Sequence, residues 1–484
     1  MLNWKQDARL LSSILMVFTL VMSIPTAIAW SSREHDAFRG FLWAMFTALV
    51  LAALLYHISL SASSRKLGTR DGYILVTTTW LLVTAIGAIP LRASGAFPTY
   101  TAAYFEIMSG FSTTGASVIP VHDAIPSSIH FWRSATNWLG GMGIIVLFVA
   151  LVPVMGSGGA KLVGAEFVGP TKDKLTPKIR NTALSLWLIY VGLSVLQAIL
   201  LLAGGIPLYD AATITFSTMS AAGFSPYAGG VSFFSSRYVL VIVIIFMFLS
   251  GVNFALFFKA LMGQGKLAIR DKELRTYGII TLVVATAGGI SLAFSGMYDI
   301  GESFFQSLFQ TVSFISTTGF VTADYQTWPA FNQMLLFILI FIGGCAGSAA
   351  GGIKVMRIMT MARLAKVHMR QRLHPNGVFP VHVGTKILSP EVTRGVSAYF
   401  GIYFTTALAG ILVISLTGVD FETAVSSVLT CLSNVGIGFG QVGPKGSFAM
   451  FPPWAHWVFS FLILAGRLEF FTVFTVFTRD FWKR

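Results

Sequence analysis

Four short stretches of the sequence repeat one pattern of serine, threonine and glycine. They read SGFSTTG at 109–115, STMSAAG at 217–223, SFISTTG at 313–319 and TCLSNVG at 430–436. A serine stands three residues before the last glycine of every stretch, and a serine or threonine stands six residues before it. The four glycines are 108, 96 and 117 residues apart. Such a recurring interval marks a repeated structural unit.

A loop built in this way suits the binding of a cation by the backbone. Glycine adopts backbone conformations that are barred to residues with a side chain. Four such loops around one axis would present rings of carbonyl oxygens, which can replace the hydration shell of a cation. We predict that three residues of each loop line the ion path and bind the ion through their backbone: Thr113, Thr114, Gly115, Ala221, Ala222, Gly223, Thr317, Thr318, Gly319, Asn434, Val435 and Gly436.

Small residues also let membrane helices pack closely, which is the alternative interpretation of the same pattern. A single stretch would be weak evidence against that alternative. Four stretches in register favour a filter in which the backbone of these loops binds the cation.

The elements that must position these loops are membrane spans. Of the 484 residues, 55% are hydrophobic and 11% are charged, whereas soluble domains carry about 25% charged residues. A bilayer crossing takes about 20 apolar residues. Ten apolar runs are candidates for crossings and lie near 10–30, 38–60, 73–91, 136–156, 183–204, 237–262, 277–296, 331–362, 395–418 and 454–478.

Four shorter segments precede the glycine loops, near 101–113, 209–220, 301–315 and 420–432. They are too short to span a bilayer and are typical of re-entrant helices. Each unit therefore reads as a helix, a short re-entrant helix, a glycine loop and a second helix. The C-terminal end of each short helix carries a partial negative charge, which favours a cation at the loop.

The net charge of +14 follows the rule for membrane proteins and does not indicate a nucleic-acid partner. With a cytoplasmic N-terminus and alternating crossings, 26 of the 33 Lys and Arg residues fall on the inner side and six on the outer side. This orientation puts the four short segments outside. The outer segments also hold ten Asp and Glu residues, an excess that attracts cations to the mouth of a pore. The two cysteines support neither a disulfide framework nor a zinc site.

A gate is predicted within the run at 331–362, which is too long for one crossing. Glycine and serine make up six of the ten residues 343–352, and glycine costs about 1 kcal/mol in a helix interior, so the helix should break there. Arg467 lies in another apolar run and should face the pore, because an arginine facing lipid is costly. We predict a gate formed by Gly344, Cys345, Ala346, Gly347, Ser348, Ala349, Ala350, Gly351 and Arg467.

The gate residues have structural alternatives as well. For the loop the alternative is a close helix-packing site, and for Arg467 it is a structural salt bridge with a neighbouring acid. At the level of function, the alternative to passive conduction is a symporter coupled to protons or sodium. Such a transporter needs an ionisable relay inside the membrane, and the mid-span charges here are Arg467 and Glu469. An intramembrane enzyme is not expected, because the sequence has no catalytic pair at depth.

The sequence resembles the Trk/Ktr/HKT superfamily of potassium transporters, and within it the bacterial TrkH type. FSTTGAS, SAAGFS, STTGFV and SNVGIGFG look like the filter loops of that family. GGCAGSAAGGIKV at 343–355 looks like its intramembrane gating loop, GRLEFFTVF at 466–474 like its last helix, and GGMGIIVL at 140–147 also fits. The resemblance covers nearly the whole chain. Ala221-Ala222 and Asn434-Val435 depart from the Thr-Thr of the other two loops, which leaves strict selectivity for potassium over sodium open.

The resemblance implies an all-α integral membrane protein with four helix–pore-helix–helix repeats in pseudo-fourfold arrangement around one pore. An extra N-terminal helix pair is part of the TrkH type, so the first run is expected to be retained although Ala27-Ile28-Ala29 resembles a signal-peptidase site. The expected domains are the helix pair at 1–65 and pore repeats at 66–165, 166–265, 266–375 and 376–484. The third repeat contains the broken helix and the gating loop.

The function implied by the resemblance is potassium uptake across the bacterial inner membrane. Potassium is then the transported substrate, bound at the filter residues, and no cofactor is expected on this chain, which carries no nucleotide fingerprint. The resemblance further implies a homodimer with one pore in each subunit. It also implies a cytosolic nucleotide-binding regulatory subunit of the TrkA type, docked on the basic inner segments 157–182, 259–276 and 354–394. The alternative interpretation of these segments is that they only set the topology and contact headgroups of the lipid bilayer.

Overall fold

The computed structural model describes residues 2–60, 68–119, 125–143, 179–227, 229–383 and 386–483. Nearly all of the regular structure in these residues is helical. The exception is a two-stranded antiparallel hairpin, β1 (His382–Val383) and β2 (Lys386–Ile387). Most of the run expected at 136–156 and of the basic segment 157–182 lies outside the described residues.

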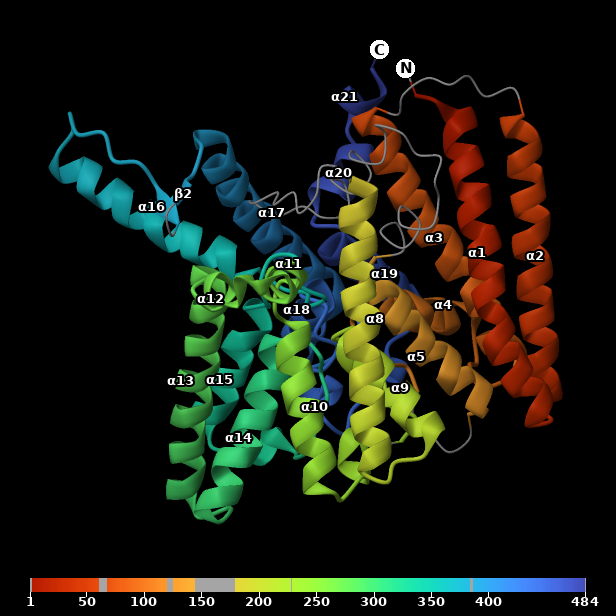
Figure 1. Cartoon of the computed structure of the whole chain (residues 1–484), viewed down its shortest axis with the longest axis horizontal. Coiled ribbons are helices and arrows are strands. Elements are labelled where there is room, and N and C mark those ends of the chain that lie inside the picture. The colour runs from red at the N-terminus through yellow and green to blue at the C-terminus, as the bar shows by residue number, and fades with distance from the viewer. Residues whose placement is uncertain are drawn as a thin grey trace.

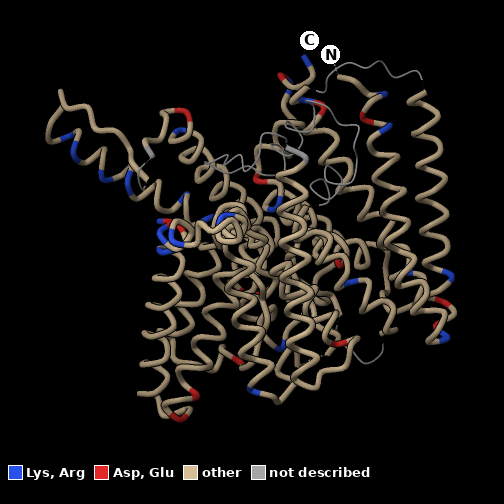
Figure 2. The backbone as a smooth tube through the Cα atoms, viewed as in Figure 1, with Lys and Arg blue, Asp and Glu red and all other residues tan. Residues whose placement is uncertain are grey.

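Six helices of the described residues are long and apolar enough to cross a membrane. They are α1 (Trp4–Ser31), α2 (His35–Ser59), α3 (Thr69–Ala93), α8 (Ile179–Ala203), α13 (Lys272–Ser295) and α17 (Pro390–Ser415). Five of them, α1, α2, α3, α8 and α13, run in roughly the same direction through the body in Figure 1. Lys, Arg, Asp and Glu gather towards the two ends of these helices and leave their middle largely uncharged (Figure 2).

Two runs that were expected as crossings are broken helices. The run at 237–262 becomes α10 (Arg237–Ser250) and α11 (Phe254–Lys259), which continues through η3 (Ala260–Gln264) and α12 (Gly265–Ile269) after a bend of 96°. The run at 454–478 becomes α19 (Pro453–Arg467) and α20 (Phe471–Val476), followed by α21 (Arg479–Trp482). Asn253 caps the second half of the first bend, since its side chain accepts the N–H of Ala255.

The run at 331–362 is interrupted where its glycines lie. Helix α15 (Ala330–Phe341) ends before the first glycine, and α16 (Val355–Leu373) begins after the last one. Residues 342–354 between them form a loop whose base is closed by a parallel bridge between Ile342 and Ile353. Helix α16 carries Lys and Arg along its length and projects sideways from the body at the end where the two termini lie (Figures 1 and 2).

Four short helices match the segments expected before the glycine loops. They are α4 (Tyr100–Phe111), α9 (Leu208–Met219), α14 (Ile300–Ile315) and α18 (Phe421–Leu432). Polar residues begin two of them, because Thr99 accepts the N–H of Ala102 and Asp420 accepts that of Thr423. The Thr423 hydroxyl also donates to the Asp420 carboxylate at 2.6 Å, which holds the pKa of this exposed group below its usual value.

The contacts of the short helices repeat with a regular offset. Helix α4 packs on α3, on α5 (Ser127–Gly141) and on α19. Helix α9 packs on α8, α10 and α5, helix α14 on α13, α15 and α10, and helix α18 on α17, α19 and α15. Each short helix thus touches the helix before it, the helix after it and the helix that follows the previous short helix. The N-terminal pair α1 and α2 packs outside this set, against α3 and α5.

The connections add short 3-10 turns after the loops. These are η2 (Gly230–Phe233), η4 (Tyr325–Thr327), η5 (Gly440–Val442) and η6 (Phe448–Met450). One of them ties distant parts of the chain together, since the N–H of Phe448 donates to the carbonyl of Ser117 at 2.9 Å.

Candidate functional site

Each short helix ends at a serine and is followed at once by left-handed backbone. The C-terminal caps are Ser112, Ser220, Ser316 and Ser433. The residues after them have φ of 57°, 59°, 58° and 53° and are Thr113, Ala221, Thr317 and Asn434. Positive φ is rare outside glycine, and for a β-branched threonine it is a true outlier that persists only where the surroundings enforce it. The same strain therefore occurs at the same place in all four loops.

Backbone hydrogen bonds to the preceding helix fix each loop at this turn, and one of them has the same length in all four loops. The residue before the loop glycine donates its N–H to the carbonyl of the serine or threonine five residues earlier, at 2.9 Å in every case. The pairs are Thr114 with Ser109, Ala222 with Ser217, Thr318 with Ser313, and Val435 with Thr430. Each of these bonds satisfies one carbonyl of the last helical turn as the chain leaves the helix.

The loop glycines stand where no side chain fits. Their φ angles lie between 71° and 82°. A Cβ atom on each would also collide with the carbonyl oxygen of the neighbouring loop. The distances would be 1.9 Å for Gly115 and Ala222, 2.1 Å for Gly223 and Thr318, 2.5 Å for Gly319 and Val435, and 2.1 Å for Gly436 and Thr114. Each loop thus abuts the next, and the fourth abuts the first.

The structure brings all twelve predicted filter residues together in this way. Gly115 and Gly223 are half-buried, and the other ten are buried. The side chains of two threonines turn back to their own loops, since Thr114 shares a hydrogen bond with Ser112 and Thr318 with Ser316, both at 2.7 Å. Hydroxyls engaged in this way leave the carbonyls as the groups free to bind an ion. That these residues bind an ion stays a prediction.

The side chain of Asn434, which replaces a threonine of the Thr-Thr pattern, connects the fourth loop to other elements. Its side-chain nitrogen donates to the Thr114 hydroxyl at 2.9 Å and to the Ile463 carbonyl at 3.1 Å. The amide therefore links the fourth loop to the first and to α19. Neither threonine nor alanine carries two donors that could make both contacts.

The loop at 342–354 lies directly against the glycine loops. The N–H of Gly351 donates to the Thr317 hydroxyl, and the N–H of Gly352 donates to the Ser433 carbonyl, both at 2.7 Å. On its other side the loop is bound to the bend between α10 and α11. Cys345 donates to the Gly251 carbonyl at 2.8 Å, and Ala349 to the Ser250 carbonyl at 3.1 Å.

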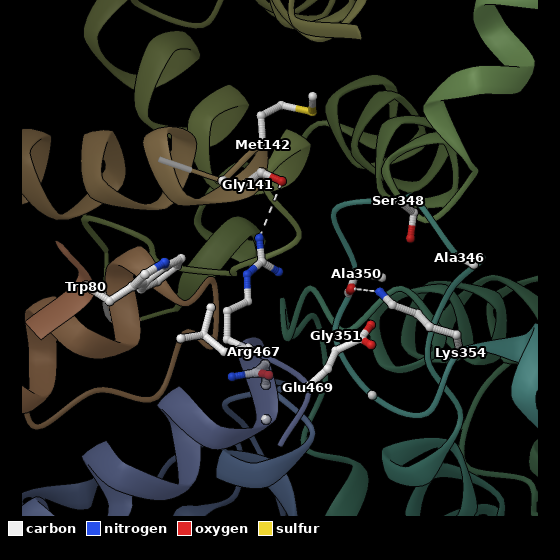
Figure 3. A pocket seen from close by; sticks show the side chains of 16 residues that line it. Trp80, Gly141, Met142, Ala346, Ser348, Ala350, Gly351, Lys354, Arg467 and Glu469 are labelled. Carbon is white, nitrogen blue, oxygen red and sulfur yellow. Dashed lines mark hydrogen bonds between the residues drawn. The ribbon is translucent and has the colours of Figure 1, made fainter. Parts of the chain in front are cut away.

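Arg467 fastens this loop from a third direction. One guanidinium nitrogen donates to the Ala349 carbonyl at 2.9 Å, and another donates to the carbonyl of Gly140 at 2.6 Å. Figure 3 shows the side chain extending beside a cavity towards Gly141, while Lys354 reaches Ala350 on the other side. The cavity has a volume of about 80 Å³, which is room for several water molecules.

The surroundings of Arg467 differ from those expected. The sequence placed Arg467 within one uninterrupted crossing at 454–478, and this is wrong. Arg467 is the last residue of α19, and Glu469 and Phe470 adopt positive φ of 56° and 55° in the break that follows. The break lets Glu469 pair with Arg357 of α16.

A second correction concerns the acidic residues that were expected to attract cations to the mouth. Glu106 was counted among them, but its side chain is fully buried and paired with Arg133 at 2.7 Å. It therefore adds no free charge at the outer surface.

The sequence interpretation missed two charged residues that hold the loop. Lys354 donates to the Ala350 carbonyl. Glu273, near the start of α13, accepts the N–H groups of Ala346 at 2.8 Å and of Met356 at 2.9 Å, and so ties the loop and the start of α16 to one carboxylate. Lys354 follows the glycine run two residues after Gly352, and this position could have indicated a role in holding the loop. Glu273 is distant from the loop in the sequence, and nothing in the sequence indicated its role.

Comparisons with known proteins agree over the full chain. The family model TrkH, described as a cation transport protein, matches residues 36–279 and 278–483. The chain is 36% identical over 486 residues to the Trk system potassium uptake protein TrkH of Salmonella typhimurium, with 100% of both chains covered. It is 34% identical over 473 residues to TrkG of Escherichia coli, with 97% of both covered. The crystal structure of the potassium transporter TrkH from Vibrio parahaemolyticus is similar with a TM-score of 0.88 and 32% identity, covering 100% of each chain.

The hydrogen bond between Gly351 and Thr317 can be tested by hydrogen–deuterium exchange. Thr317→Val leaves the buried N–H of Gly351 without its acceptor, at a cost of about 1–3 kcal/mol, so exchange in 343–354 should rise about tenfold. Thr113→Val is the matched control, because the Thr113 hydroxyl is buried with no hydrogen-bond partner among the described residues. Equal exchange in the two variants would contradict this contact.

Proposed function

Because the chain belongs to the TrkH family of cation transport proteins, we propose that it takes up potassium by conducting the ion through a filter of backbone carbonyls. The family is one of transporters, so the chain is not an enzyme. The observation that carries the proposal is the closed sequence of contacts in which each glycine loop abuts the carbonyl of the next. Potassium is the transported substrate, and its ligands are the carbonyls of the twelve filter residues.

The filter rests on four pore repeats in pseudo-fourfold arrangement around one pore. The regular offset in the packing of α4, α9, α14 and α18 supports this arrangement. The repeats occupy 66–165, 166–265, 266–375 and 376–484, and the pair at 1–65 stands outside them. The loops lie at the C-terminal ends of the four short helices, whose partial negative charges favour a cation there.

The filter is tested by Gly319→Ser. The new side chain would have to hold φ of 78°, and its Cβ would lie 2.5 Å from the Val435 carbonyl oxygen, so that carbonyl must move. In liposomes, the preference for K⁺ over Na⁺ should fall about tenfold, since a shift of 1.4 kcal/mol between ions has that effect. Gly278→Ser is the control, because a Cβ there meets no atom within 4 Å. Unchanged uptake and selectivity in Gly319→Ser would contradict the filter.

The loop at 342–354 serves as the gate, and Arg467 adds an electrostatic barrier. Support comes from the position of the loop, since it bonds to Thr317 and Ser433 on one side and to Arg467 on the other. Lys354 and Arg467 both line the cavity next to it. Fixed positive charge in a confined, low-dielectric space opposes the passage of a cation. Opening requires the loop to give up these bonds.

Removing either part of the gate should raise flux in the absence of any partner. Arg467→Ala removes the bonds to Ala349 and Gly140, and shortening of 345–351 removes the obstruction itself. Each should increase basal ⁸⁶Rb⁺ influx into liposomes by at least about fivefold, the effect of losing roughly 1 kcal/mol of closed-state stabilisation. Arg70→Ala is the control, because Arg70 also donates to a backbone carbonyl, that of Lys483, but near the chain termini. If both gate variants fold and conduct no faster than the parent, the gate lies elsewhere.

The ion pair that holds Glu469 favours passive conduction over proton- or sodium-coupled symport. A coupled transporter needs a carboxylate that takes up and releases the driving ion. Glu469 is the acid that the sequence singled out at this depth, and it is paired with Arg357. The Arg357 guanidinium also lies 3.9 Å from the centroid of the Tyr399 ring. Flux that depends on a proton or sodium gradient would show coupling.

The remaining proposals concern location and partners. The chain acts in the bacterial inner membrane as a homodimer with one pore in each subunit. A nucleotide-binding regulatory subunit of the TrkA type docks on the basic inner face, at 157–182, 259–276 and 354–394. The basic residues along the projecting helix α16 support this surface (Figure 2).

Nucleotide should bind the regulatory partner and not this chain. Isothermal titration of the purified chain with ATP and with NAD should therefore give no binding heat. Measurable binding of either nucleotide by the isolated chain would contradict the assignment.

A further inference from the structure

A buried ion pair lies beside the first glycine loop. The Arg133 guanidinium donates to one oxygen of the Glu106 carboxylate from Nε at 2.8 Å and from a terminal nitrogen at 2.7 Å. The two side chains are 2% and 0% exposed. Burial of two charges gains stability only when geometry and further hydrogen bonds compensate for lost hydration, and an apolar pair often serves as well. The further contacts of this pair are therefore informative.

The carboxylate holds the backbone that leaves the first loop. The second oxygen of Glu106 accepts the N–H of Val118 at 2.8 Å, and the first oxygen accepts the Ser117 hydroxyl at 2.9 Å. Ser117 and Val118 come two and three residues after Gly115. Glu106 belongs to α4, so it connects the helix before the loop to the chain after it.

The guanidinium reaches the second loop as well. It lies 4.2 Å from the ring centroid of Phe224, a distance at which a cation is attracted to the face of an aromatic ring. Phe224 directly follows Gly223. Arg133 thus contacts the exit of the second loop directly and the exit of the first loop through Glu106 and through the Ser117 hydroxyl, at 3.3 Å.

We propose that Arg133 and Glu106 set the spacing between the first and second loops and are thereby determinants of ion specificity. The inference rests on the carbonyl filter proposed above. A carbonyl ring distinguishes potassium from sodium through the positions and field of its oxygens. Neither residue touches the ion path, so both act as positioning residues, through Val118 and Phe224.

A second arginine pair with the same chemistry provides a matched control. Arg237 pairs with Glu302 at 2.6 Å and lies 3.6 Å from the ring centroid of Phe305. The side chains of Arg237 and Glu302 are 54% and 33% exposed. Arg237 belongs to α10, and its two partners belong to α14. The two pairs differ in burial and in attachment to the loops, which are the properties that the proposal invokes.

The decisive experiment replaces each arginine by lysine. Arg133→Lys keeps the charge but loses the planar fork, and with it the simultaneous contacts to Glu106, Ser117 and Phe224. Purified protein in liposomes is tested for ⁸⁶Rb⁺ influx in competition with K⁺ and with Na⁺. The ratio of the two inhibition constants should fall about tenfold, the effect of losing one charge-assisted hydrogen bond. Arg237→Lys should leave the ratio unchanged.

A second variant keeps the test valid if lysine disturbs folding. Glu106→Gln combined with Arg133→Met removes both charges, so no uncompensated charge stays buried. It should reach the membrane and show the same loss of preference for potassium. Dividing the maximal ⁸⁶Rb⁺ influx rate by the amount of protein in the membrane separates a change in selectivity from poor accumulation of the variant.

Three outcomes would overturn the proposal. Parental selectivity in Arg133→Lys or in the double variant does so, and if Gly319→Ser still alters selectivity, the carbonyl filter stands without this role for the pair. If Gly319→Ser is also without effect, the filter itself fails. If neither variant of the pair accumulates while Arg237→Lys does, the pair serves the stability of the fold and not the spacing of the loops.

Discussion

Backbone that leaves a helix inside an apolar molecule must find hydrogen-bond partners, and the centre of this protein is organised by that constraint. Four loops leave their helices at equivalent points, and each satisfies its turn with consecutive N–H groups bonded back to the helix. The carbonyls next to the glycines are left to face the neighbouring loop. In the function proposed here, a cation takes these oxygens as ligands, and this binding would offset the strain of the backbone at the four turns.

The same constraint explains how the loop at 342–354 is held. Its N–H groups are distributed over the bend after α10, the third and fourth glycine loops and the Glu273 carboxylate. A net contribution of about 1 kcal/mol for each bond makes such a loop firm when all bonds are made. Because the bonds go to several separate elements, a small shift of one element weakens the loop without unfolding its neighbours. The gate proposed for this loop needs that property.

The arginines inside the protein differ in the groups that they contact. Arg133 is neutralised by Glu106 and lies beside the first glycine loop, where a free positive charge would repel a cation in the proposed filter. Arg357 is paired with Glu469 at the break after α19. Arg467 instead points its guanidinium at the carbonyls of Ala349 and Gly140, beside the cavity that lies against the gate loop. The helix break at 468–470 lets Arg467 and Glu469, which are two residues apart, point towards different partners.

Composition, the positions of apolar runs and the repeated serine–glycine pattern determined much of this protein. They identified the long spans, the bounds of the short helices to within two residues, the break before Val355 and the residues of the four loops, because these depend on local hydropathy, length and glycine content. They did not identify the breaks after Ser250 and Arg467, which depend on caps and on an ion pair with α16. They also misjudged Glu106, since only packing decides whether a carboxylate faces water or an arginine. The partners of Asn434, Glu273 and Thr317 lie on other elements of the chain, and a contact between distant residues exists only once the tertiary structure brings them together.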